Sequence, residues 1–88
     1  MITVQKIDDT TFEVTVEGRG VTTHKVTVTP AYYEQLTGRR VPVEVLVEKS
    51  FEFLLAREPN TSILRSFDLP VIGRYFPEYE SVIVEMIA

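Results

Sequence analysis

His24 is the only histidine in the chain, and it is therefore the only ordinary side chain expected to change charge near neutral pH. A histidine acts as a general base when a nucleophile or an orienting carboxylate lies within about 3 Å of it. No motif in the sequence places such a partner beside His24. We therefore favour a partly buried histidine with one backbone or hydroxyl partner, and keep a titrating or ligand-binding site at His24 as the alternative.

Metal binding and enzymatic chemistry have little support in the sequence. One histidine without a spaced carboxylate partner is not a ligand set, and the chain has no cysteine for thiolate sites, disulfides or nucleophiles. Asp8 and Asp9 fall where we expect a hairpin loop, and aspartate is common in turns. The chain has no glycine-rich phosphate loop, nucleophile elbow or paired-histidine motif. We expect no enzyme activity, catalytic residue, metal or cofactor.

Glu44, Glu48 and Glu52 lie four residues apart and form an acidic stripe on a predicted helix. Like charges at this spacing destabilise a helix by about 0.2–0.5 kcal/mol per pair. A solvated helix face is the favoured interpretation, and a surface for a basic partner is the alternative.

Three aromatic residues, Tyr75, Phe76 and Tyr79, fall within five positions near the C-terminus. They cannot all point inward from one short segment, so we expect at least one ring near the surface. Exposed aromatic rings often anchor protein interfaces. We predict a possible interface at these three residues, with residues at the rim of the core as the alternative.

Residues 61–79 also resemble a helix-turn-helix, with Arg65 on a first short helix and Arg74 on a second. The second helix is brief and runs into glutamates, which a phosphate backbone repels. The chain carries nine Lys and Arg against thirteen Asp and Glu, a net charge of −4, whereas nucleic-acid binders are usually basic. A DNA-binding or toxin–antitoxin-type regulator is therefore only an alternative.

Two hairpins are predicted to position these residues. Residues 11–17 alternate apolar and polar side chains. A three-residue loop from Gly18 to Gly20 keeps the apolar residues on one face and sets Glu13 opposite Lys25, whereas a two-residue loop mixes the faces. The predicted pairs are Phe12 with Val26, Val14 with His24, and Val16 with Thr22.

A second three-residue loop at residues 8–10 sets Val4 opposite Val14, and Lys6 then faces Phe12. The result is an antiparallel three-stranded meander with one apolar face and one polar face. Its edges, at residues 2–7 and 21–28, would each be open to pairing with another chain. The apolar face is predicted to carry Ile2, Val4, Phe12, Val14, Val16, Val26 and Val28.

The rest of the chain has helical signals. Thr29 and Pro30 are a strong helix start, and Gly38 is a natural stop. An amphipathic pattern from Pro42 to Arg57 predicts the central helix.

Three short helices are predicted after Pro59. Asn60 or Thr61 caps the first, which runs through Phe67, and a second covers residues 71–76. Residues 77–88 are predicted to be helical, although Ser81–Val84 is β-branched enough for a strand.

Composition indicates one domain, residues 1–88, of ordinary soluble globular character, with 44% hydrophobic and 25% charged residues. No apolar run approaches the ~18 residues of a membrane span. The first residues alternate and do not resemble a signal peptide. These features lead us to expect a cytoplasmic protein.

The strings SFEFLLAREP at residues 50–59 and YFPEYE at residues 75–80, with SIL, Phe67, Leu69 and Ile72 between them, are the most distinctive part of the sequence. With these residues, and with residues 33–38 upstream, the chain resembles a family of small bacterial proteins of unassigned function. The resemblance covers roughly the last sixty residues. It implies a compact bacterial cytoplasmic domain and assigns no catalytic residue.

The predicted fold is α+β, an N-terminal three-stranded antiparallel meander with one face covered by a central amphipathic helix and short C-terminal helices. The leading functional hypothesis is a non-enzymatic protein-interaction module or small subunit, which forms a homodimer or binds another protein. The alternatives are the DNA-binding regulator at residues 61–79 and a small-ligand binder or enzyme that uses His24. A small-molecule ligand is left open, and binding to membranes is not expected.

Overall fold

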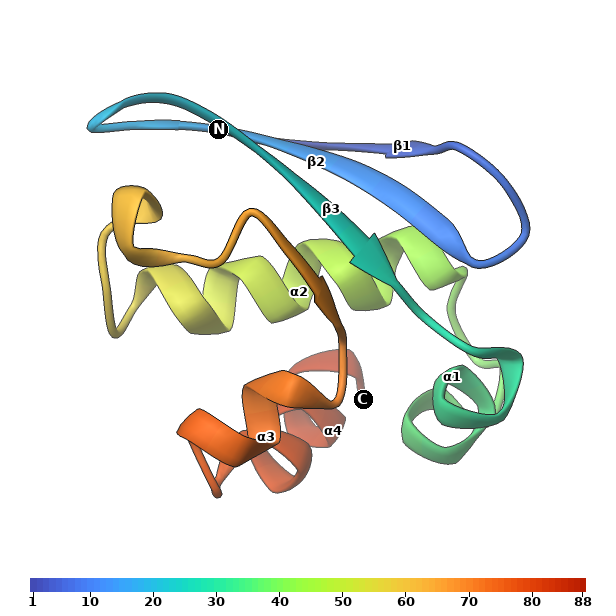
Figure 1. Ribbon diagram of the computed structural model, residues 1–88. Helices are drawn as coiled ribbons and strands as arrows, with labels where there is room; N and C mark the ends of the chain where they lie inside the picture. The colour runs from blue at the N-terminus through green and yellow to red at the C-terminus, as the bar shows by residue number, and fades with distance from the viewer.

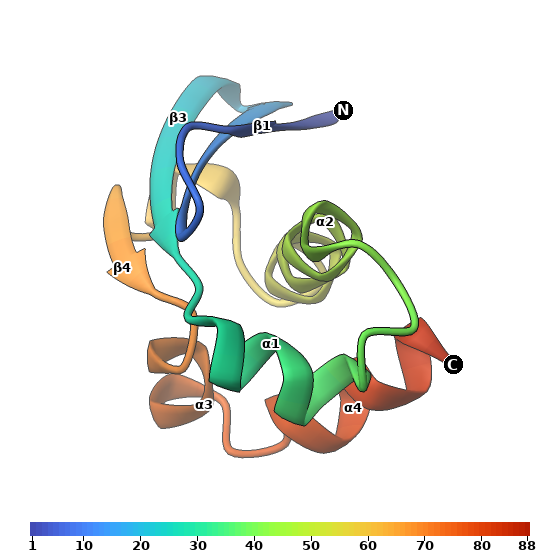
Figure 2. The same cartoon turned by 90° about the vertical axis from the view of Figure 1, so that its right-hand side faces the viewer.

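The computed structural model describes residues 1–88 as three layers (Figures 1 and 2). A four-stranded sheet lies on one side of the long helix α2, and the shorter helices α1, α3 and α4 lie on the other. In chain order the elements are β1 (Ile2–Lys6), β2 (Thr11–Gly18), β3 (Gly20–Thr27), α1 (Pro30–Thr37), α2 (Val43–Leu55), the 3₁₀ turn η1 (Asn60–Ser62), β4 (Ser66–Asp68), α3 (Val71–Tyr75) and α4 (Tyr79–Ile87).

The predicted meander of β1, β2 and β3 and its register are confirmed. Val14 pairs with both Val4 and His24, and Glu13 faces Lys25. Gly20 has φ of 75°, the left-handed conformation that the three-residue hairpin requires and that glycine adopts without strain.

The loop between β1 and β2 is held by an aspartate turn. One carboxylate oxygen of Asp8 accepts hydrogen bonds from the backbone N–H groups of Thr10 and Thr11, at 3.0 and 2.8 Å. The N–H of Thr10, with weaker help from Thr11, lowers the pKa of the Asp8 carboxyl below its usual range. Asp8 therefore shapes the hairpin, as expected of aspartate in a turn.

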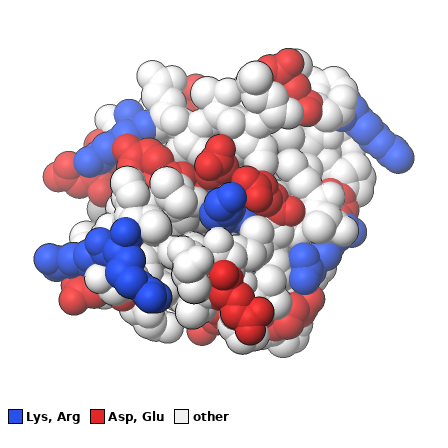
Figure 3. Space-filling model, turned by 180° about the vertical axis from the view of Figure 1, so that it is seen from behind, with Lys and Arg blue, Asp and Glu red and all other residues white.

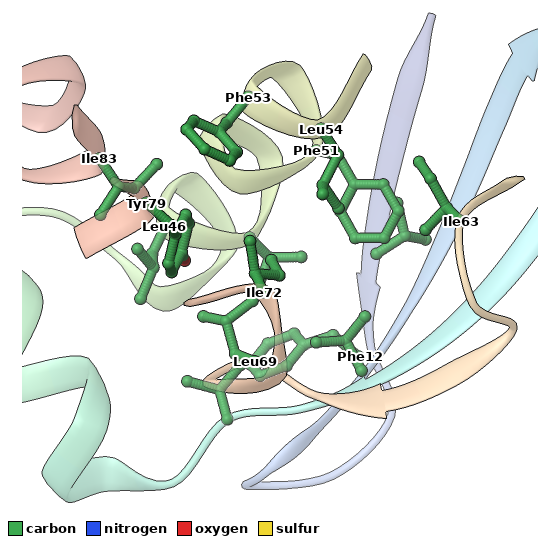
Figure 4. Close-up of a cluster of buried hydrophobic side chains, with 14 of the residues drawn as sticks. Phe12, Leu46, Phe51, Phe53, Leu54, Ile63, Leu69, Ile72, Tyr79 and Ile83 are labelled. Atoms are coloured by element: carbon green, nitrogen blue, oxygen red, sulfur yellow. The ribbon is translucent and has the colours of Figure 1, made fainter. Parts of the chain in front are cut away.

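The apolar face of the sheet rests on α2, as predicted. Val14 and Val26 are both 0% exposed. The buried side chains of α2 cover more than one stripe, because Phe51 packs toward the sheet side while Phe53 packs edge-on against Tyr79 of α4, with ring centroids 5.2 Å apart (Figure 4). The central helix is thus enclosed from two sides.

One hydrogen-bonded pair lies inside this core. The hydroxyls of Ser50 on α2 and Tyr79 on α4 are 2.7 Å apart, and Ser50 also bonds the carbonyl of Leu46 at 2.7 Å. Both side chains are fully buried. Burial raises the pKa of the Tyr79 hydroxyl, so it stays protonated over the physiological range and remains available as a donor.

The helical prediction for residues 60–67 was wrong beyond the single turn η1. The chain instead crosses from the end of α2 to the open side of β3, and β4 pairs there in parallel with Lys25–Thr27. We call residues 60–68 the crossover segment. The N–H of Lys25 donates to the carbonyl of Arg65 at 2.7 Å. The open edge of β3 gains partners this way, and this non-local pairing outweighs the local capping signal of Asn60.

The other helical predictions are confirmed. The Thr29 hydroxyl caps α1 by accepting from the N–H of Tyr32, and Gly38 ends it with φ of 58°. The ambiguous C-terminal residues form the helix α4 and not a strand. None of the helices has the length and apolar character needed to cross a membrane.

Ser50 and Tyr79 should be energetically coupled. Ser50→Ala leaves the buried Tyr79 hydroxyl without a partner and should destabilise the protein by about 1–3 kcal/mol. Tyr79→Phe should cost about 0.5–1.5 kcal/mol. In the double variant no hydroxyl is stranded, so its loss should be smaller than the sum of the two. Urea denaturation of the four proteins measures this, and strict additivity would contradict the pair.

Candidate functional site: an apolar groove beside α3

A mostly apolar hollow in the surface lies where α2, the crossover segment and α3 meet. Its volume is about 300 Å³. We call it the α3 groove. Eight of its ten lining residues are hydrophobic: Leu54, Ile63, Leu64, Phe67, Val71, Ile72, Tyr75 and Phe76.

The α3 groove has a buried floor and an exposed rim. Leu54, Ile63 and Ile72 are at most 6% exposed and belong to the core shown in Figure 4. Leu64 and Tyr75 are 47% and 66% exposed. A large aliphatic and a large aromatic side chain are thus exposed to water beside an apolar recess, and large contiguous apolar patches on monomers often mark interaction sites.

Glu58 is the only charged residue that lines the α3 groove. Burial raises the pKa of its carboxyl above the ordinary value, and no salt bridge joins it to any cation. Its neighbour Arg57 is engaged elsewhere, with Glu78 at 3.2 Å. Arg19 lies with Glu58 along a second, shallow hollow without forming an ion pair. Glu58 is therefore a partly buried carboxylate that has no ion pair within the chain.

His24 fixes the wall of the α3 groove from behind. Its Nδ1 lies 2.7 Å from the carbonyl of Leu64, and its Nε2 lies 2.9 Å from the Thr22 hydroxyl. A carbonyl only accepts, so Nδ1 carries the proton and donates to Leu64. The ring is 1% exposed and packs on Phe51, with centroids 5.4 Å apart. His24 is therefore more deeply buried than we expected from the sequence, and it holds two partners instead of one.

Asn60 fixes the start of the same wall. Its side-chain oxygen accepts from the N–H of Arg19 at 3.0 Å, and its side-chain nitrogen donates to the carbonyl of Gly20 at 3.3 Å and to the hydroxyl of Thr22 at 3.0 Å. A Cβ added at Gly18 would come within 3.1 Å of the Asn60 oxygen, so the backbone approaches Asn60 closely there. The Thr22 hydroxyl joins Asn60 to His24, and together they bind the crossover segment to the β2–β3 hairpin.

Two of the three predicted interface aromatics lie at the α3 groove. Tyr75 forms its exposed rim, and half-buried Phe76 lines it and packs edge-on against Phe53 at 5.8 Å. Tyr79 is 0% exposed in the core and contributes no surface. The prediction that at least one of these rings reaches the surface is confirmed by Tyr75.

The other sequence candidates do not assemble into a site. Residues 61–79 lack the first helix of a helix-turn-helix, so that structural prediction was wrong. The acidic stripe is partly balanced by Lys49, which lies 3.5 Å from Glu52, and acidic and basic side chains are interspersed over the face seen in Figure 3. No group of three or more acidic or histidine side chains is placed to hold a metal ion.

The two predicted sheet edges differ in the structure. β4 occupies part of the edge of β3, which corrects the expectation that the whole strand is open. β1 has a neighbour on one side only, so its outer edge remains free.

Sequence reasoning missed Glu58, Ile63 and Leu64 as site residues. These three come together only because the crossover segment runs back along β3. One signal was present: residues 66–69 read Ser-Phe-Asp-Leu, a polar–apolar alternation before Pro70 that indicates a strand.

No protein-family model matches this chain, and no curated protein or solved structure shows significant similarity to it. The functional argument therefore rests on the groove itself.

Asn60→Ala should destabilise the fold by about 2 kcal/mol, because it strands the N–H of Arg19 and the carbonyl of Gly20 in a partly buried place. Guanidinium denaturation measures this loss. The neighbouring Thr61 is exposed, and Thr61→Ala should change stability by less than about 0.5 kcal/mol. Equal stabilities for Asn60→Ala and the wild type would show that Asn60 does not clamp the segment.

At a protein concentration low enough to keep the chain monomeric, Glu58→Gln should raise the melting temperature at neutral pH by a few degrees at most. The folded protein raises the pKa of Glu58, so it binds more protons than the unfolded chain and loses stability as the pH rises through that pKa. The difference between variant and wild type should shrink in acid, where the carboxyl is protonated. A difference between Glu58→Gln and the wild type that stays constant with pH would contradict the assignment.

Proposed function

We propose that this chain is a non-enzymatic protein-interaction module that binds apolar side chains of a partner protein in the α3 groove. The observation that supports this best is the pairing of a buried apolar floor with the exposed Leu64 and Tyr75 at its rim. Interfaces are typically organised in this way, with a few aromatic and aliphatic anchors around a desolvated centre.

A protein fits the α3 groove better than a small molecule does. The groove volume of about 300 Å³ is at the lower end of the range for small-molecule pockets. Such pockets also carry several convergent polar groups that orient the ligand. Here Glu58 is the only charged lining residue, and the exposed Tyr75 extends the apolar surface beyond the recess.

The wall of the α3 groove is held in place before any partner arrives. His24 of the hairpin donates a hydrogen bond to the carbonyl of Leu64 in the crossover segment, and Asn60 of that segment accepts one from the N–H of Arg19 in the hairpin. The crossover segment is therefore already ordered before a partner binds. A preorganised surface loses less conformational entropy and binds more tightly for the same contact area. This gives the buried histidine a supporting role in binding, without any role in chemistry.

Glu58 adds a charge preference. Its carboxylate lacks a cationic partner within the chain and borders apolar surface, where a charge–charge contact is screened less than in water. The preferred partner segment therefore carries an apolar anchor with Lys or Arg beside it. A bacterial and cytoplasmic setting stays a prediction from the sequence.

Selection from a displayed random peptide library tests this function. The immobilised protein should enrich peptides with an aliphatic or aromatic anchor next to Lys or Arg, and Leu64→Asp should abolish their binding because it places a charge at the rim of the groove. Val21 is 67% exposed on β3, away from the groove, so Val21→Asp is the matched control and should bind as the wild type does.

Circular dichroism should show that Leu64→Asp folds, since its side chain is 47% exposed. Failure to enrich any peptide that depends on Leu64 would overturn the proposed function.

A further inference from the structure

We propose that the partner in the α3 groove is a second copy of this chain, related by a two-fold axis, with Arg74 of each copy paired to Glu58 of the other. This inference rests on the proposed function and names its occupant. It is drawn from the self-complementary character of one surface.

A two-fold interface uses the same patch on both subunits, so the patch must carry both halves of every contact. The surface at the α3 groove does so for apolar contacts. It has a recess over Leu54 and Ile63, and beside this recess it presents Leu64 and Tyr75 to solvent. Two such surfaces placed face to face let the projecting ring of each copy enter the recess of the other.

The charges at this surface are complementary in the same way. Glu58 lines the recess and has no ion pair, whereas Arg74 lies beside Tyr75 in the last turn of α3, is exposed, and has no ion pair either. Because Arg74 precedes Tyr75 on α3, the proposed contact pairs Arg74 of one copy with Glu58 of the other. The two-fold axis then forms this ion pair twice.

A stable dimer buries roughly 800 Å² per subunit, and the chain exposes 5120 Å² in total, so the contact needs about a sixth of the surface. Residues 62–76 run continuously past the recess and hold the exposed Leu64, Arg74 and Tyr75.

Charge reversal with mixing tests the pairing. Multi-angle light scattering at micromolar concentrations should give wild-type particles of twice the 10.1 kDa chain mass. Glu58→Arg and Arg74→Glu should each raise the dissociation constant of the dimer at least tenfold, because each variant turns both symmetry-related ion pairs into pairs of like charge. An equimolar mixture of the two variants should recover dimers of near wild-type affinity, since both pairs in the heterodimer are then of opposite charge.

The matched control is Glu17→Arg, which should dimerise by itself as the wild type does, because the exposed Glu17 lies at the end of β2 and does not line the groove. Adding Glu17→Arg to Arg74→Glu should not restore wild-type affinity to the Arg74→Glu subunits. Three results would each overturn the proposal: a wild-type monomer at every concentration, a dimer unaffected by either reversal, or no recovery in the mixture. The peptide selection reads groove binding independently, so its success beside a monomeric wild type would refute only the second copy as occupant.

Discussion

The packing of α2 between two apolar surfaces is the constraint on which the rest of the structure depends. One side of the helix covers the valines of the sheet, and the other receives α4 through Phe53 and Tyr79. Each buried side chain of this size contributes about 1.5–3 kcal/mol. A small domain has few buried contacts to offset the loss of chain entropy on folding. A helix that packs on both of its sides increases the number of these contacts and so allows a core to form within 88 residues.

The crossover segment is instead held by polar side chains, which have few other hydrogen-bond partners once they are buried. Asn60, Thr22 and His24 form a chain of hydrogen bonds that ends on the carbonyl of Leu64. No buried side-chain polar atom is left without a partner. Removing one of these side chains leaves the next polar group buried without a hydrogen-bond partner. The hydrogen bonds therefore fix the position of the segment as well as stabilise it. The α3 groove inherits its shape from this chain of bonds.

Much of the fold could be predicted because its signals are local. Alternation and loop length set the register of β1, β2 and β3, since a shift of one residue would turn Val14 and Val26 to solvent. The groove could be predicted only in part. The crowded aromatics pointed to Tyr75 and Phe76 as surface candidates, but the same argument included Tyr79, whose hydroxyl has a partner in the buried Ser50. A pattern of residue types does not reveal whether a hydroxyl will find a partner across the core.

The sequence by itself determined the three-stranded meander, its apolar face, the caps of α1 and the helical character of α2, because each of these depends on residues a few positions apart. Only the tertiary structure decided that residues 66–68 form a strand beside β3, that His24 supports the groove wall, and that Glu58 and Tyr75 line the same groove. These juxtapositions join residues up to about forty positions apart. They follow from the unpaired hydrogen-bonding groups at the edge of β3 and from the packing of distant segments into one core, and no local sequence pattern encodes either.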